Sequence, residues 1–146
     1  IAVDWQAHPQ VERLPAGAGI RGPPAKPVAL ALADVLTPYP LAHQVFLATS
    51  YVEHENQARR AFGQPYVEAP PCVQGALTSV VFNRGASMTG AGRVEFRAIR
   101  DDCLPRRDYQ CVAQQIRAMT RLWVGTDIEA GMRRRREAEA QLVEQA

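Results

Sequence analysis

Lysine is almost absent from this sequence of 146 residues. Of its 17 basic residues only Lys26 is lysine, and the others are arginine. Arginine binds carboxylates and phosphates through two parallel hydrogen bonds better than lysine does. The formal net charge is only +2, so charge alone does not indicate a polyanionic partner. We interpret the excess of arginine over lysine as a result of codon composition. The alternative is that the arginines serve in bidentate recognition of a ligand.

Long hydrophobic runs are also missing, and none approaches the ~20 apolar residues that a membrane-spanning helix needs. Residues Ile1 to Trp5 have neither the charged leader nor the apolar segment of a signal peptide. Because the sequence begins without Met, we expect a processed chain or a piece of a longer protein. Hydrophobic residues make up 47%, and the length fits a single domain over residues 1–146.

Several motifs of catalysis and metal binding are absent. His8, His43 and His54 have no metal-ligand spacing, either among themselves or with the cysteines. The sequence contains no Ser-His-Asp arrangement and no phosphate-binding loop. We therefore predict neither a metal site nor a cofactor.

The sequence contains three cysteines, of which two can form a bridge. Cys103 and Cys111 flank the segment LPRRDYQ, whose proline favours a turn, so a disulfide between them is feasible and Cys72 would be left free and buried. Three reduced cysteines are the alternative. A disulfide would indicate that the protein works outside the cytoplasm.

Apolar periodicity indicates helices, and no segment has the pattern of a long strand. Pro24 opens a helix to about Leu36, and Asp127 is the expected N-cap or first-turn acid of the last helix. We predict an all-α fold of about five to seven helices around one central apolar helix. The expected helical ranges are 24–36, 41–60 (with Leu41, Val45, Ala48 and Val52 on one face), 70–85, 92–100, 109–121 and 127–146.

The expected central helix begins at Pro70-Pro71 and ends in Asn83-Arg84-Gly85. Its interior is apolar over more than half of its circumference, which predicts burial of Leu77 and Val80 among others. Gly85 can adopt the left-handed conformation that closes a helix. Two interpretations of this end stay open: a simple helix cap, or a polar shelf at the edge of a binding cleft.

Three segments resemble the C-terminal lobe of phage-type lysozymes (glycoside hydrolase family 24), which include phage endolysins and lysozyme effectors delivered to the periplasm. The segments are QGALTSVVFNRGASMTG, EFRAIRDD and IRAMTRLWVGTDIEAGMRRRREAEAQLVE. The similarity covers residues 70–146, whereas residues 1–69 match only loosely. The residues that carry it are Phe82, Asn83, Arg84, Gly85, Trp123, Gly131, Arg134, Arg135, Glu137 and Glu139.

The resemblance implies a bacteriolytic, peptidoglycan-cleaving lysozyme that acts in the periplasm or cell wall, or after secretion. Its partners would be glycan strands, and an inhibitor or immunity protein is a further possible partner. The implied substrate-binding residues are Asn83, Arg84 and Gly85, with Trp123 and a turn from Gly131 to Arg134 as the far wall of a cleft. Trp123 can equally be a core residue.

The catalytic acid of that family has no counterpart in this sequence. The family carries its Glu near the start of the enzyme, followed by an acidic residue and a Thr in a small β-hairpin lobe. The glycine-rich segment AGAGIRG lacks that Thr and the preceding Glu. The resemblance therefore implies that the catalytic Glu lies upstream of Ile1, and that this chain is the helical lobe alone.

Two charged segments are open to other interpretations. Glu53 and Glu55 lie about 200° apart on a helix, so they cannot act as a catalytic pair, and we expect a solvated face. Arg133 to Arg136 point in four directions, and the spacing predicts ion pairs of Glu129 with Arg133 and of Arg135 with Glu139. We therefore do not predict a nucleic-acid partner. An inert helical module that binds glycan or protein is the main alternative to the lysozyme.

Overall fold

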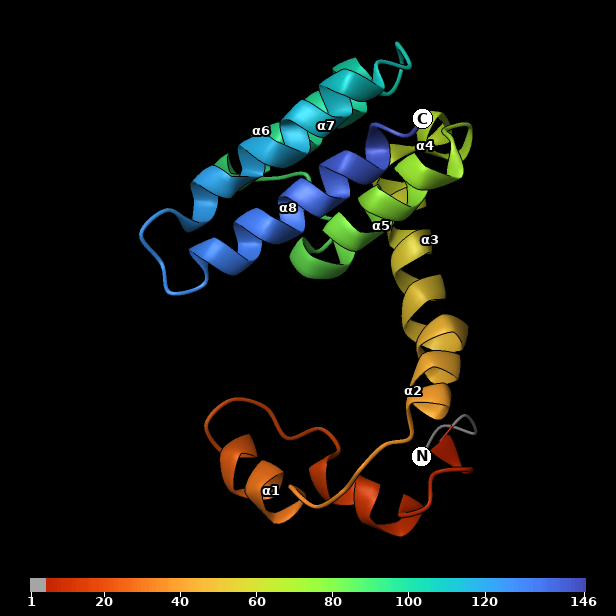
Figure 1. The fold of residues 1–146 in the computed structure, drawn as a ribbon, viewed down its shortest axis with the longest axis vertical. Coiled ribbons are helices and arrows are strands. Elements are labelled where there is room, and N and C mark those ends of the chain that lie inside the picture. Colours follow the sequence, from red (N-terminus) through yellow and green to blue (C-terminus); the bar gives the residue numbers. More distant parts are fainter. Residues whose placement is uncertain (1–4) are drawn as a thin grey trace. The chain divides into compact units, whose positions relative to one another are not determined.

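The structure is a computed structural model that describes residues 5–146, and throughout that range it contains helices and no strand (Figure 1). The predicted all-α fold is therefore confirmed. The chain divides into two compact units, Ile1–Tyr51 and Val52–Ala146, which are described separately. The interpretation of residues 1–146 as a single functional domain stays a prediction.

The first unit is built from short helical pieces. Arg13 joins two of them, because its guanidinium binds both carboxylate oxygens of Asp34 at 2.6 and 2.8 Å and the Ala31 carbonyl at 3.2 Å. The helix expected from Pro24 ends at Ala31 rather than near residue 36, and Arg13 satisfies the carbonyl of its last residue. The elements are the 3₁₀ helix η2 (Val11–Gly17), α1 (Ala25–Ala31), α2 (Tyr39–Val45) and the π-helix η3 (Phe46–Tyr51).

The apolar face expected along residues 41–52 is only partly buried. Val45 is buried, but Ala48 and Val52 are exposed. The π-helical turns of η3 contain more residues than α-helical turns, so they rotate the later side chains away from the expected stripe. The helical conformation of this segment is as predicted, whereas its continuous apolar face is not.

The second unit contains the larger core. Its elements are α3 (Val52–Phe62), α4 (Gln64–Val67), α5 (Pro71–Arg84), the 3₁₀ helix η4 (Ala91–Arg93), α6 (Val94–Ala98), the π-helix η5 (Ile99–Cys103), α7 (Tyr109–Ala118), the 3₁₀ helix η6 (Met119–Trp123) and α8 (Glu129–Val143). In Figure 1, α7 and α8 run side by side, and α8 also packs against α5.

α5 is the central helix of this unit, as predicted. It packs against α3, α4 and α8. Leu77 and Val80 are both 0% exposed, and the helix starts at Pro71, where proline is tolerated because the first-turn N–H groups have no helical partner. The apolar side chains of α5 therefore form the centre of the hydrophobic core against which α3, α4 and α8 pack.

Cys103 and Cys111 form a disulfide between the end of η5 and the start of α7, with their Cα atoms 5.4 Å apart. The turn between them is further fixed by Asp108, whose side chain accepts a hydrogen bond from the Cys111 N–H at 2.9 Å. Cys72 is the free cysteine, but it is half-buried rather than buried as expected. Its position in the first turn of α5 places it at the edge of the core.

The start of α8 differs from the prediction. Ile128, not Asp127, is the residue that precedes the first turn, and Asp127 is exposed. The Glu129 carboxylate instead accepts a hydrogen bond from the Gly125 N–H at 2.7 Å, which lowers the pKa of Glu129, with Arg133 adding to the effect. Glu129 is therefore the acidic residue of the first turn of α8, but its bond goes to Gly125 before the helix and not to a first-turn N–H.

Within residues 5–146, no helix combines the length and the apolar character needed to cross a bilayer.

Candidate functional site

The predicted shelf Asn83-Arg84-Gly85 lies at the C-terminal end of α5. Gly85 has a positive φ of +72°, and its N–H donates to the Val81 carbonyl at 2.7 Å. Its ψ of 168° places it not in the expected left-handed helical region but in an extended region that is accessible almost only to glycine. The chain therefore leaves α5 abruptly, and Asn83 and Arg84 diverge from that point.

Arg84 lies half-buried over two aromatic rings. Its guanidinium carbon is 5.1 Å from the centre of the Phe96 ring and 5.7 Å from that of Trp123, and Nη2 donates to the Gly92 carbonyl. The buried Nη1 has no hydrogen-bond partner within the described chain. Desolvation, followed by the nearby charge of Arg93, lowers the pKa of Arg84 to about 10.

Four arginines hold the backbone that follows α5. Arg84, Arg93, Arg97 and Arg121 all donate to main-chain carbonyls of residues 84–92, which we call the arginine-held loop. Among residues 5–146, Arg84, Arg93 and Arg97 have no carboxylate within ion-pair distance, so positive charge accumulates around this loop. The accepting carbonyls belong to Arg84, Gly85, Met88, Gly90, Ala91 and Gly92.

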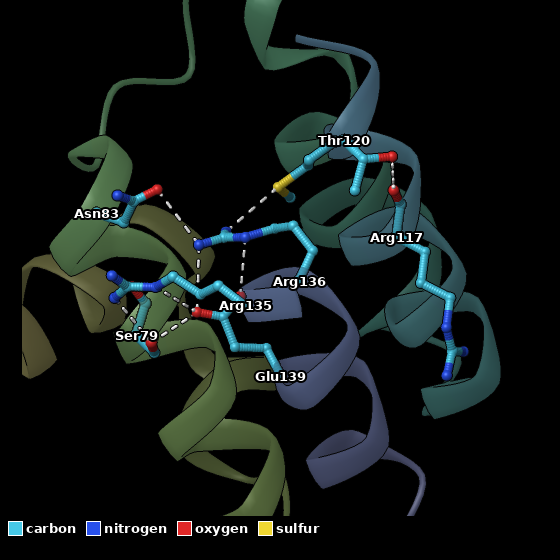
Figure 2. A network of polar contacts seen from close by, with 8 residues as sticks. Ser79, Asn83, Arg117, Thr120, Arg135, Arg136 and Glu139 are labelled. Atoms are coloured by element: carbon cyan, nitrogen blue, oxygen red, sulfur yellow. Dashed lines mark hydrogen bonds and ion pairs between the residues drawn. The ribbon is translucent and has the colours of Figure 1, made fainter. Parts of the chain in front are cut away.

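Asn83 belongs to a polar network that enters the core (Figure 2). Arg136, on α8, is 0% exposed, and its Nη2 donates to the Asn83 Oδ1 at 3.3 Å and to the Glu139 Oε1 at 3.2 Å. The Arg136 Nε lies 3.0 Å from the Glu139 Oε2, as an ion pair without hydrogen-bond geometry. The exposed amide of Asn83 is thus connected to a buried charge pair.

Glu139 is held from two elements. It accepts hydrogen bonds from the Ser79 hydroxyl on α5 at 2.6 Å and from the Arg135 Nε at 3.2 Å. Arg135 also donates to the Ser79 carbonyl at 3.3 Å, which ties α8 to α5. With these bonds the network fixes the side of α5 that ends at Asn83.

Trp123 contributes to both halves of this cluster. It is half-buried against the hydrophobic core, and its ring lies 5.7 Å from the guanidinium carbon of Arg84 and 5.8 Å from that of Arg136. Cation–π contacts of this kind stabilise buried guanidinium groups that lack a full set of hydrogen bonds. Trp123 therefore packs against the hydrophobic core and also contacts the guanidinium groups of Arg84 and Arg136 with its ring.

Gly131 and Arg134 do not join this cluster. Both lie within α8 rather than on the expected turn, because the helix already begins at Glu129. Arg134 is exposed and lines shallow surface hollows with Arg133. Arg136 faces the core, and residues two apart on a helix point about 200° away from each other. The predicted far wall is therefore not built from these two residues.

Most residues of the two charged segments lie at the helix surface, whereas Arg136 and Glu139 are buried. Arg133 pairs with Glu129 at 2.9 Å and Arg135 with Glu139 at 3.2 Å, so the predicted i,i+4 pairs are confirmed. On α3, Glu55 pairs with Arg59, and Glu53 accepts a hydrogen bond from Gln57. Within residues 5–146, no three His, Cys, Asp or Glu side chains are grouped so that they could hold a metal ion.

Sequence reasoning missed Ser79, Arg93 and Arg136 as members of the cluster. A signal for Ser79 was present, since Ser79 and Asn83 are four residues apart and thus share one face of an otherwise apolar helix. Arg136 looked like one of four equivalent surface arginines, and only the fold distinguishes it.

The chain matches no protein-family model, and comparison with curated proteins and with solved structures gives no match. The resemblance to phage-type lysozymes therefore rests on the sequence segments themselves.

Proposed function

We propose that this chain is the helical lobe of a lysozyme that cleaves the β-1,4 bond between N-acetylmuramic acid and N-acetylglucosamine in peptidoglycan. The observation that carries the proposal is the cluster at the end of α5. Asn83, Arg84 and Trp123, to which the resemblance assigns substrate contact, are linked there through Arg136 and through ring contacts. A simple helix cap does not require such a connection.

The proposed role of this chain is to bind the glycan rather than to supply the acid. Glycoside hydrolysis uses one carboxylic acid to protonate the leaving oxygen and a second carboxylate to attack or to activate water. The buried carboxylates of Glu95 and Glu139 are ion-paired with Arg121 and Arg136. Guanidinium groups inside the protein engage oxygens of both carboxylates, so neither side chain is free to reach a glycosidic oxygen. We therefore place the catalytic Glu upstream of Ile1, as the resemblance implies.

The compartment we propose is the periplasm, the cell wall or the outside of the cell. The disulfide between Cys103 and Cys111 supports this assignment, because disulfides persist in oxidising compartments. An inhibitor or immunity protein remains part of the proposal as a partner. Both an endolysin and a delivered effector fit this description.

The second candidate is a catalytically inert module that binds glycan. It is favoured by the same pairing of Glu95 and Glu139, which leaves neither buried carboxylate free to act. The two candidates share the binding surface and differ only in whether a catalytic lobe acts with it.

A zymogram separates the two candidates. The chain is assayed alone and together with its natural upstream segment in a gel that contains peptidoglycan. Clearing only in the presence of the upstream segment supports the lysozyme. Binding to the wall without clearing in either form supports the inert module, and neither binding nor clearing excludes both.

A further inference from the structure

The hydrogen bond between Arg136 and Asn83 determines which way the Asn83 amide points. A guanidinium has only donors, so the atom of Asn83 that it contacts must be the oxygen. In Figure 2 the oxygen of Asn83 faces Arg136 and its nitrogen is turned away.

The Asn83 amide nitrogen is available to a ligand. Asn83 is exposed, and within the described part of the chain its Nδ2 has no hydrogen-bond partner. The same side chain therefore has one end bound inside the protein and the other end open at the surface.

The inner end is rigid, because Arg136 is 0% exposed and is fixed by Glu139, which Ser79 and Arg135 hold in turn. A donor that is fixed before binding loses less conformational entropy when it meets its ligand.

We propose that Arg136 is a positioning residue that fixes Asn83 as a hydrogen-bond donor, and that this donor selects sugars carrying an acetamido carbonyl. The inference rests on the proposed glycan-binding function and names the sugar group that the site recognises. A carbonyl oxygen only accepts hydrogen bonds, so it matches a donor that is fixed in place. A sugar hydroxyl can donate or accept, so a fixed donor would not distinguish one hydroxyl-bearing sugar from another.

The surroundings of Asn83 favour the same choice. Arg84, Arg93 and Arg97 have no carboxylate within ion-pair distance in residues 5–146, so the adjacent arginine-held loop is positively charged. A de-N-acetylated sugar carries an ammonium group there in place of the carbonyl. Both the fixed donor and the positive charge would disfavour that group.

The test is Asn83→Asp, which changes the outer end of the side chain and keeps the inner one. One carboxylate oxygen can still accept from Arg136, now as an ion pair, so folding should be preserved. The other oxygen replaces the donor with a charged acceptor. Asn56→Asp is the matched control, since Asn56 is an exposed amide on α3 outside the network.

Binding is measured by calorimetric titration of each variant with tri-N-acetylchitotriose and with its de-N-acetylated form at pH 5.5, alongside thermal melts. The parent and Asn56→Asp should prefer the acetylated sugar. Asn83→Asp should melt no lower than the parent, bind the acetylated sugar about tenfold or more weakly, and bind the amino sugar more tightly. Asn83→Ala should lose up to about tenfold for the acetylated sugar without gaining affinity for the amine.

A change in Arg136 tests the positioning role itself. Arg136→Lys keeps the charge but loses the planar fork, so a folded variant should show a reduced preference for the acetylated sugar. If Arg136→Lys does not fold, Asn83→Asp still decides whether the Asn83 donor selects the acetamido sugar.

The outcomes separate the inference from the function on which it rests. If Asn83→Asp binds both sugars like the parent, Asn83 is only a bridge to Arg136 and the inference is overturned. If the parent binds neither sugar, the proposed glycan-binding function fails and the inference fails with it.

Discussion

Arg136 and Glu139 lie three residues apart on α8 and form an ion pair, with the Arg136 Nε 3.0 Å from the Glu139 Oε2. The two residues are 0% and 6% exposed. Placing both charges in the core costs desolvation energy, so the pair as a whole adds little to stability, whereas removing one partner leaves the other charge uncompensated.

Glu139→Gln should lower the free energy of unfolding by about 3–5 kcal/mol, because it leaves the Arg136 guanidinium buried without a counter-charge. Urea unfolding followed by circular dichroism measures the change. Glu53→Gln, at an exposed position on α3, is the control and should be nearly neutral. A loss below about 1 kcal/mol for Glu139→Gln would mean that water reaches this pair and screens it.

Leu77→Ala should cost about 2–5 kcal/mol of stability, since it leaves a cavity at the centre of α5. The same urea titration applies, with Leu142→Ala as the control at a position that is 36% exposed. The control should lose about 1 kcal/mol or less. Equal losses in the two variants would contradict the central position of α5.

Thiol counting under denaturing, non-reducing conditions should give one free thiol per chain, that of Cys72. Replacing both Cys103 and Cys111 by Ser should destabilise the fold by about 2–4 kcal/mol, because the unfolded chain regains the freedom that the closed loop removes. Three free thiols in protein purified from its native compartment would remove the support for an oxidising environment.

Arg117 should make stability sensitive to acid. It binds Glu137 and Glu144, and these contacts lower the pKa of both carboxyl groups below their unfolded values. The stabilisation is therefore complete above about pH 5 and is lost as the pH falls through the lowered pKa values. Arg117→Gln should flatten the decline in unfolding free energy between about pH 5 and pH 3. An unchanged slope would show that salt and water screen these exposed contacts.

Arg84→Met should lower stability only modestly, by about 1–2 kcal/mol. The variant loses the bond to the Gly92 carbonyl but keeps an apolar stem over the rings of Phe96 and Trp123, and it removes the unpartnered Nη1 from the interior. Thermal and urea unfolding measure the change, with Arg134→Met as an exposed control. A variant more stable than the parent would mean that desolvation of Arg84 outweighs its contacts.

The parts of the fold that sequence predicted well are those encoded locally. Pro71 marks the start of α5, apolar residues on most of its faces indicate burial, and Gly85 marks its end. The pairs of Glu129 with Arg133 and of Arg135 with Glu139 follow from helical spacing alone.

The rest depended on contacts between distant parts of the chain. The bond from Arg136 to Asn83 joins residues 53 positions apart, and no local pattern separates Arg136 from Arg133 or Arg134. The end of α1 is likewise contacted by Arg13, which is 18 residues from the Ala31 carbonyl it binds. The spacing of apolar residues predicted the helices, but it did not show which charged side chain enters the core.

The arginine-held loop has a consequence for how this surface can change over time. Its path is fixed by side chains that bind its carbonyl oxygens, and every residue type offers the same carbonyl oxygen. The exposed Thr89 and Ala91 can therefore be exchanged without redirecting the backbone. Arg93, Arg97 and Ser87, whose hydroxyl accepts from the Thr89 N–H, cannot. Mutation can thus vary the chemistry displayed beside Asn83 while the scaffold beneath it stays constant, and new specificities can arise there without loss of the fold.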